Sequence, residues 1–424
     1  MVASIIDLGA RAKHAGRRLA RASTAQKNAA LLRIADGLTA FEADILNANA
    51  GDVQAALARR VEPYFVDRLA LNEQRLAAIA HGVRNVAALP DPVGEQFEHE
   101  TLPNGLRLHK RRVPLGVLAC IYESRPNVTI DIAALALKSG NAAVLRGGSD
   151  NLASNKAMLR VISAALANES LPEAAVQLIE DTDRARILDL LRLNDYIDLI
   201  IPRGGAALHD LCRKNSTIPV ITGGMGINHI FVDESADQAQ AADICFNAKV
   251  SAPSVCNSLG TVLVHSAIST EFLPALAARM GGKAVELHCD PRSFAALGGL
   301  QNHNCKIVRA DDARDWDIEW LALTAGVRVV DSIDEAIAFI HAHSLEHSDG
   351  IVSRDAVSIE KFINEVDSCG VFVNASTRFN DGSQFGLGAE VAVSTQRIHA
   401  RGPLGLRELT SYKWVCEGDG HVRW

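Results

Sequence analysis

The stretch that decides the fold is VLACIYESRPNVTIDIAALALKSGNAAVLRGG, residues 117–148. It opens with the apolar run VLACIY, continues through a loop into a helical stretch that ends at Gly140, and returns to a second apolar run, AAVLR, before Gly147 and Gly148. A strand, a helix and a strand within about 30 residues form a βαβ unit, whose two strands must be parallel. The sequence therefore predicts a parallel sheet.

The same alternation of apolar runs and helical stretches continues along the chain, which is typical of doubly wound α/β domains. We expect strands at residues 176–179, 197–201, 218–222 and 229–232, and in a second series at 261–264, 327–330, 350–353 and 371–373. The 424 residues are enough for two domains of this kind. We therefore predict an α/β fold with two α/β domains.

Two features precede the first of these strands. Ser23 to Gln26 matches a capping box, and the apolar positions after it predict one amphipathic helix: Leu31, Ile34, Leu38, Phe41 and Ile45. The run ETLPNGLRLHKRRV, residues 100–113, alternates around a Pro-Asn-Gly turn and predicts a protruding hairpin. Its basic cluster fits a solvated or interfacial face of that hairpin better than an anion site: Arg107, His109, Lys110, Arg111 and Arg112.

Composition narrows the possible partners and compartment. The net charge is −7 and the pI is about 6.1, whereas nucleic-acid binders usually carry a strongly basic domain, so we expect no nucleic-acid partner. The sequence contains no run of 18 apolar residues and no pattern typical of a signal peptide, so we expect no membrane association and a cytoplasmic protein. Most of the eight cysteines then fit small, buried, reduced side chains.

Ligands of an open parallel sheet bind beyond the carboxyl ends of its strands, so the loops there carry the candidate residues. In ESRPNVT, residues 123–129, Asn127 stands where a helix should begin and is either its N-cap or a chemical group. Two glycine pairs, one in Arg146-Gly147-Gly148-Ser149 and one in Pro202-Arg203-Gly204-Gly205, are either tight turns or phosphate-binding loops. Neither matches GxGxxG, but an arginine beside such a loop can hold a ribose or a 2′-phosphate.

Cysteine and histidine suggest two further sites. Cys256, in the uncharged loop NAKVSAPSVCN, is either a nucleophile or a structural thiol. HAHSLEH, residues 341–347, offers no obvious fourth zinc ligand, so we expect no metal there.

Several strings taken together resemble a known family: YESRPNVT, LALKSGNAAVLRGGS, DLIIPRGG, NAKVSAPSVCN, HSLEHSDGIV, VNASTRFNDGSQFGLGAEVAVSTQ and HARGPLGLRELTSYKW. They resemble the γ-glutamyl phosphate reductases, or glutamate-5-semialdehyde dehydrogenases, of the aldehyde dehydrogenase superfamily, over nearly the whole chain. The resemblance implies an oxidoreductase of proline biosynthesis that uses NADPH to reduce L-glutamyl 5-phosphate to L-glutamate 5-semialdehyde and releases phosphate.

The resemblance also implies an aldehyde-dehydrogenase-like architecture. A Rossmann-type NADP-binding domain would span residues 1–228, interrupted by the hairpin at about 97–115, and an α/β catalytic domain would span residues 229–373. Residues 374–424 would form a return segment and an oligomerisation tail, which joins the hairpin in a β arm. Such an enzyme would be a homo-oligomer, with a possible association with a glutamate kinase.

Residue roles follow from the same resemblance. Cys256 would be the nucleophile that forms a thioester, and Asn127, with the Cys256 backbone N–H, would stabilise the oxyanion. Residues expected to bind NADP are Arg146, Gly147, Gly148, Ser149, Gly204, Gly205 and Glu319. Candidates for the substrate's carboxylate and phosphate are Arg125, Lys249 and Arg378.

Two differences bear on the chemistry. The stretch IPVITGGMGINHIFV, residues 218–232, has no acidic residue to activate water, which argues against the alternative of a hydrolytic aldehyde dehydrogenase. Many family members read NAKTQRP before the cysteine loop, whereas Val250, Ser251 and Ala252 stand here and remove a positive charge. Family members also often have a cysteine where Asn228 stands, a change to which we attach no function.

A second functional alternative is an inactive scaffold for a glutamate kinase. The presence of both Cys256 and Asn127 argues against it.

Overall fold

The computed structural model describes residues 4–61, 63–123, 125–223, 225–299, 304–310 and 313–423. The chain divides into two compact units, and the predicted α/β fold is confirmed in both. Unit 1 consists of Met1–Thr222, Gly386–Ala392 and Leu404–Trp424, and unit 2 consists of Gly223–Phe385 and Val393–Pro403. No helix among the described residues is both long and apolar enough to span a membrane.

Unit 1 is built on a parallel sheet in the order β5-β4-β3-β6, with β3 (Val117–Tyr122), β4 (Ala142–Arg146), β5 (Val176–Leu178) and β6 (Leu199–Arg203). All six residues of β3 are buried because helices cover both faces, which explains its uninterrupted apolar sequence. One face packs on α1 (Ile5–Leu19), α8 (Ala185–Leu190) and α9 (Ala206–Asn215). On the other face the Tyr122 hydroxyl bonds Thr129 of α6 (Asn127–Lys138), which in turn bonds Asn155 of α7 (Leu152–Asn168).

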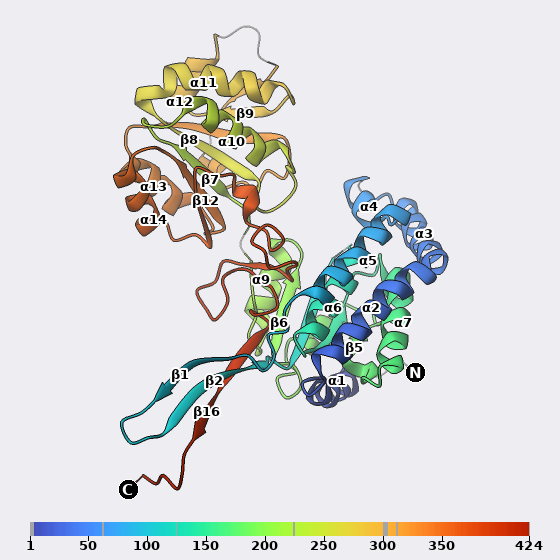
Figure 1. Ribbon diagram of the computed structural model, residues 1–424. Helices are drawn as coiled ribbons and strands as arrows, with labels where there is room; N and C mark the ends of the chain where they lie inside the picture. Colours follow the sequence, from blue (N-terminus) through green and yellow to red (C-terminus); the bar gives the residue numbers. More distant parts are fainter. Residues whose placement is uncertain are drawn as a thin grey trace. The chain divides into compact units, whose positions relative to one another are not determined.

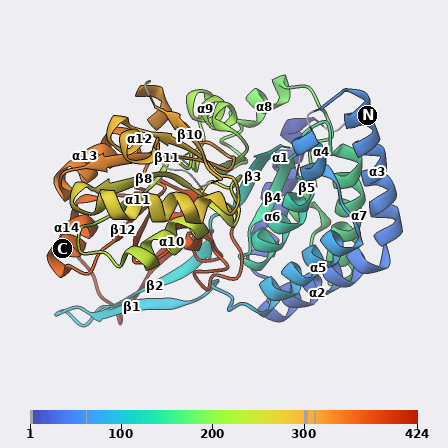
Figure 2. The same ribbon diagram turned by 90° about the horizontal axis from the view of Figure 1, so that it is seen from above.

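The remaining helices of unit 1 form a layer against α6 and α7, as Figure 2 shows. They are α2 (Thr24–Ala40), α3 (Glu42–Ala58), α4 (Pro63–Leu69) and α5 (Glu73–Ala88), and the short η1 (Glu173–Ala175) precedes β5. The predicted capping box is present, with Ser23 and Gln26 bonding each other's backbone. The predicted single helix is wrong, however, because α2 ends at Ala40 and the exposed Phe41 separates it from α3.

A three-stranded antiparallel sheet projects from unit 1 as an arm (Figure 1). The predicted hairpin is confirmed as β1 (Gln96–Thr101) and β2 (Arg107–Pro114). The third strand, β16 (Thr410–Glu417), pairs with β2 along its whole length, so residues about 300 positions apart in sequence lie side by side.

Unit 2 holds a second parallel sheet in the order β10-β9-β11-β8-β7-β12-β13. Its strands are β7 (Asn228–Val232), β8 (Leu259–His265), β9 (Glu286–Cys289), β10 (Lys306–Arg309), β11 (Thr324–Val330), β12 (Ser348–Val352) and β13 (Gly370–Val373). Ile230 and Val232 face a core with α10 (Gln238–Val250), α11 (Ser266–Gly281) and α12 (Pro291–Leu297), whereas Phe231 faces a core with α13 (Ile333–His343) and α14 (Ala356–Glu365). The sheet is therefore covered on both faces (Figure 1). Shorter elements are η2 (Ala313–Trp316), η3 (Thr377–Phe379), β14 (Val393–Ser394) and β15 (Gly402–Pro403).

One predicted strand, residues 218–222, is wrong. Only Val220 forms a β-bridge there, to Ile200 of β6. Pro219 has no N–H to donate, so its carbonyl accepts from Ile200 but the ladder does not extend.

Candidate active site

Cys256 lies in the loop between α10 and β8, and its side chain is partly exposed. The fully buried side chain of Asn228, the first residue of β7, holds this loop in place. Its Nδ2 donates to the carbonyl oxygens of Cys256 (2.7 Å) and Ser258 (2.6 Å). Because β7 pairs directly with β8, the cysteine loop is tied to the sheet.

A second contact to the cysteine loop comes from Gly226. A Cβ at this position would overlap the carbonyl of Cys256, so only glycine allows the two backbones to approach this closely. The Gly226 N–H donates to Oε1 of Glu319 at 2.8 Å. Burial raises the pKa of Glu319, and the Gly226 hydrogen bond opposes that rise. Glu319 therefore lies beside the cysteine loop in unit 2.

Arg378, in η3, brings a positive charge to the same loop. Its guanidinium donates through Nη1 to Oδ1 of Asn257, the residue after Cys256, and through Nε to Oγ of Ser251 at 3.2 Å. Residues 250–257 contain no charged side chain, so Arg378 provides a cation to a loop that has none of its own.

Lys249 is near the end of α10 and is almost fully buried, with its Nζ donating to the carbonyl of Ala322 at 3.3 Å. Desolvation lowers the pKa of Lys249 to about 7. A large fraction of this amine is therefore neutral near pH 7. Lys249 thus carries less positive charge than an exposed lysine would.

Asn127 is the first residue of α6, and the N-cap position belongs to Pro126. The alternative that Asn127 caps the helix is therefore wrong. Its Nδ2 donates forward to Oδ2 of Asp131 at 2.9 Å. Burial raises the pKa of Asp131 to about 6, partly offset by this hydrogen bond and by the charge of Arg203.

The predicted cofactor loops leave one edge of the unit 1 sheet, because β4 and β6 both pair in parallel with β3. A Cβ on Gly147 would overlap the side chain of Asn155, so this glycine is required by packing. Gly148 is partly exposed and Ser149 is exposed. Nη1 and Nη2 of the buried Arg146 donate to the carbonyls of Gly147 (2.7 Å) and Thr182 (2.9 Å), whereas its buried Nε has no partner among the described residues.

The second glycine pair precedes α9. Gly205 is the N-cap of that helix, and a Cβ there would meet open space. Glu123, the residue after β3, accepts a hydrogen bond from Gly205 N–H at 3.2 Å and lies against Gly204. A carboxylate thus occupies the helix N-terminus that the sequence assigns to a pyrophosphate. Arg125 lies two residues after Glu123 in the sequence. It is half buried, and its side chain has no partner in the part of the chain described.

Comparison with known proteins identifies the family. The profile of the aldehyde dehydrogenase family matches residues 3–293. The gamma-glutamyl phosphate reductase of Roseiflexus castenholzii is 55% identical over 98% of this chain and 99% of its own length, and that of Vibrio atlanticus is 53% identical over 99% of each chain. The chain belongs to the aldehyde dehydrogenase family, among its gamma-glutamyl phosphate reductases.

Solved structures agree with that assignment. The crystal structure of the gamma-glutamyl phosphate reductase of Thermotoga maritima is 44% identical, covers 99% of both chains and gives a TM-score of 0.95. An acetylating aldehyde dehydrogenase from Geobacillus thermoglucosidasius, only 17% identical, gives a TM-score of 0.69 over 99% of this chain and 97% of its own, and so shares the fold.

The residues predicted for this reductase-family site fall into two groups. Asn127, Arg125 and the glycine loops belong to unit 1, whereas Cys256, Lys249, Glu319 and Arg378 belong to unit 2. The sequence analysis missed three residues that organise these groups, namely Asn228, Asn257 and Asp131. Only Asp131 carried a usable signal, because a carboxylate four residues after Asn127 lies on the same helix face.

Proposed function

We propose that this protein reduces L-glutamyl 5-phosphate to L-glutamate 5-semialdehyde with NADPH and releases phosphate. The observation that carries the proposal is the identity of 53–55%, over nearly the full length, to proteins named gamma-glutamyl phosphate reductase. The chain also has Cys256 on a loop that Asn228 of β7 holds by a hydrogen bond. The reaction belongs to proline biosynthesis.

Cys256 is the nucleophile of the proposed reaction. Its thiolate attacks the acyl carbon, the C–O bond to phosphate breaks, and phosphate leaves with the bonding electrons to give a thioester. NADPH supplies a hydride when bound. The thioester carbon accepts that hydride, and the resulting thiohemiacetal collapses to the aldehyde and regenerates the thiolate.

Asn127 stabilises the oxyanion of these steps in the proposal. One N–H of its amide is directed to Asp131, which fixes the orientation of the amide and leaves the second N–H to donate to the developing negative charge, together with the Cys256 backbone N–H.

The loops of unit 1 fit a dinucleotide cofactor. Open space at Gly205 before α9 and the unpartnered Nε of Arg146 both favour an anionic ligand. We propose that Arg146, Gly148 and Ser149 lie near the adenosine ribose and its 2′-phosphate, that Gly204 and Gly205 receive the pyrophosphate once Glu123 moves aside, and that Glu319 binds the other ribose. Gly147 keeps the first loop tightly packed.

Three cations are proposed for the substrate's anionic groups. Arg378 contacts the residue beside Cys256, and Arg125 has a side chain without a partner in the described ranges, so both have guanidinium groups near predicted site residues. Lys249 contributes less, because its lowered pKa leaves it partly neutral at pH 7.

Phosphate dependence tests this function. Run in reverse, the enzyme should reduce NADP in the presence of L-glutamate 5-semialdehyde only when phosphate is added, and Cys256→Ser should abolish the reaction. Turnover without phosphate would favour a hydrolytic aldehyde dehydrogenase. No turnover under either condition would favour a scaffold for a glutamate kinase.

The arm has the properties of an oligomerisation element. Its edge strand β16 exposes Tyr412 and Trp414, over which Lys110 of β2 lies at 4.5 and 5.0 Å from the ring centroids. We propose that it joins copies of this chain into a homo-oligomer. Association with a glutamate kinase and location in the cytoplasm remain predictions from the sequence.

A further inference from the structure

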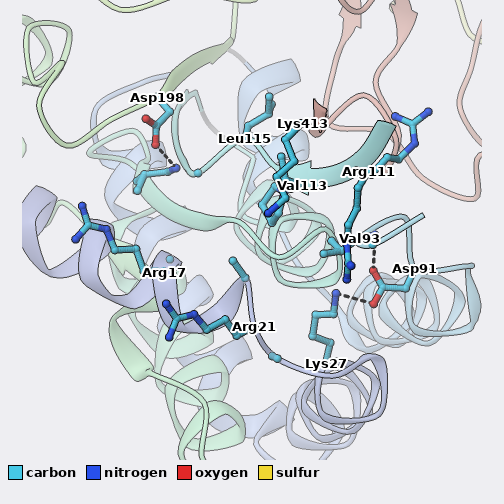
Figure 3. Close-up of a pocket in the computed structure, with 18 of the residues that line it drawn as sticks. Arg17, Arg21, Lys27, Asp91, Val93, Arg111, Val113, Leu115, Asp198 and Lys413 are labelled. Atoms are coloured by element: carbon cyan, nitrogen blue, oxygen red, sulfur yellow. Dashed lines mark hydrogen bonds and ion pairs between the residues drawn. The ribbon is translucent and has the colours of Figure 1, made fainter. Parts of the chain in front are cut away.

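A cavity of about 720 Å³ lies in unit 1 where the arm joins the rest of the unit, and Figure 3 shows its lining. Its walls come from α1, the turn before α2, the segment that leads into the arm, and strands β2 and β16. Seven basic side chains line it, against the two carboxylates of Asp91 and Asp198: Lys13, Arg17, Arg21, Lys27, Arg111, Arg112 and Lys413.

This cavity is separate from the proposed cofactor loops. Of the lining residues, Gly116 directly precedes β3, Val117 is its first residue, and Asp198 directly precedes β6. The cofactor loops follow the carboxyl ends of the same parallel strands. The two sites therefore lie at opposite edges of the sheet, roughly 15–20 Å apart, which is the length of a strand of this size.

Both carboxylates of the lining are already paired. Asp198 binds Lys13 at 2.7 Å and accepts the backbone N–H of Val117 at 2.8 Å. Asp91 binds the buried Lys27 at 2.6 Å. These acids cannot also neutralise the other basic residues of the cavity.

Four of the basic side chains have no hydrogen bond or ion pair to any residue that the structure describes: Arg17, Arg21, Arg111 and Lys413. Arg111 is exceptional in its hairpin, because Arg107, Lys110 and Arg112 each pair with a glutamate. In Figure 3, Arg17 and Arg21 lie on one side of the cavity and Arg111 and Lys413 on the other. Basic residues therefore line the cavity on both sides.

Two further features favour a particular kind of ligand. Ser23 and Thr24 place the N-terminus of α2 in the lining. The first turn of this 17-residue helix has no acidic residue of its own, and Asp91, already paired with Lys27, accepts a hydrogen bond from the Thr24 hydroxyl at 2.7 Å. Val93, Val113 and Leu115 add an apolar wall. A cavity of this size has room for a drug-sized organic molecule, well beyond a single phosphate group.

We propose that this cavity binds a small molecule carrying at least two phosphate groups. A diphosphate can contact basic groups on both sides of the cavity at once, as charge-assisted hydrogen bonding to guanidinium favours. The ligand is either an inorganic polyphosphate or a nucleotide, and only a nucleotide would use the apolar wall.

Calorimetric titration of the full-length protein tests the proposal. Pyrophosphate, ADP and inorganic phosphate are titrated at low salt into protein without NADP, because NADP itself carries a diphosphate and would compete for the cavity. Binding at the cofactor loops is recognised as the part that the cavity variants below do not change. We expect saturable binding of one diphosphate per chain, at least about tenfold tighter than that of phosphate. Tighter binding of ADP than of pyrophosphate would identify a nucleotide site, and the reverse order an inorganic polyphosphate site.

Variants locate the site. Arg21→Ala and Arg111→Ala should each weaken diphosphate binding about tenfold, the typical effect of losing one charge-assisted contact. Arg160→Ala, which removes an exposed arginine on α7 outside the cavity, should leave binding unchanged. The proposal is overturned if neither diphosphate binds, or if all three variants bind equally well. It is also overturned if wild type does not bind and Arg111→Ala changes the oligomeric state measured by light scattering, because the cations would then face another copy of the chain.

Discussion

The side chain of Asn127 donates a hydrogen bond of 2.9 Å from Nδ2 to Oδ2 of Asp131, one turn further along α6. Asp131 is the only hydrogen-bond partner of this side chain among the described residues, and burial raises the pKa of Asp131 to about 6. A carboxylate accepts and cannot donate, so it fixes which end of the amide carries the N–H groups. Asp131 is therefore a positioning residue for the proposed oxyanion donor.

Asp131→Ala should lower kcat about tenfold while KM changes less than about twofold, because the amide of Asn127 loses its orientation but remains present. Asp131→Asn should restore most of kcat, since the new Oδ1 can accept the same hydrogen bond. Steady-state kinetics checks this, together with melting curves that show both variants folded. Equal kcat values for the Ala and Asn variants would rule out a positioning role.

Asn228→Leu should destabilise the protein by about 2–4 kcal/mol, because the carbonyls of Cys256 and Ser258 lose a buried donor. Denaturant unfolding gives the free energy of unfolding. Asn364→Leu, at an exposed position on α14, is the matched control and should change it by less than about 0.5 kcal/mol. Equal stability of the two variants would show that Asn228 does not hold the cysteine loop.

Arg378→Ala should slow alkylation of Cys256 by iodoacetamide at pH 7 several-fold, because a nearby cation favours the thiolate. Ser251→Ala removes the hydrogen bonds of its hydroxyl to Nε of Arg378 and to the carbonyl of Asn247 but leaves the charge of Arg378 in place, so it should have little effect. Mass spectrometry of the Cys256 peptide follows the reaction. An unchanged rate in Arg378→Ala would mean that its charge does not reach the thiol.

His347 makes the folded state sensitive to acid. Burial lowers its pKa to about 4, whereas an unfolded histidine has a pKa near 6.5. The unfolded chain therefore binds more protons between these values, and stability falls as pH drops through this window, by up to about 1.4 kcal/mol per pH unit from this group. His347→Gln should flatten the pH dependence of the melting temperature between pH 6.5 and 4, and His81→Gln, at an exposed site on α5, should not. Parallel curves for wild type and His347→Gln would contradict this assignment.

The parts of the fold that follow from local pattern could be predicted from the sequence. VLACIY predicted a strand of a parallel sheet, and β3 pairs in parallel with β4 and β6. Ser23 and Gln26 predicted the start of α2 through a capping box. These features depend on residues that are close in the sequence, so the local sequence pattern is enough to predict them.

Features that depend on tertiary contacts could not be predicted. No Gly or Pro marks the break at Phe41. The short β9 and β10, ELHC and KIVR, mix polar and apolar residues because they lie toward one edge of the sheet. Asn228 reaches a carbonyl 28 residues away, and the burial of Lys249 has no signature in its neighbours. Cys256 and Asn127 were candidates from their loops alone, but their roles were assigned only because the surrounding motifs resemble a family.

The most direct test of the proposed chemistry is intact-mass and peptide mass spectrometry of enzyme incubated with an acyl phosphate donor and no NADPH. One glutamyl group per chain should appear on Cys256, with one equivalent of phosphate released, and Cys256→Ser should carry no hydroxylamine-labile adduct. An adduct on another residue, or turnover without any adduct, would contradict thioester catalysis by Cys256.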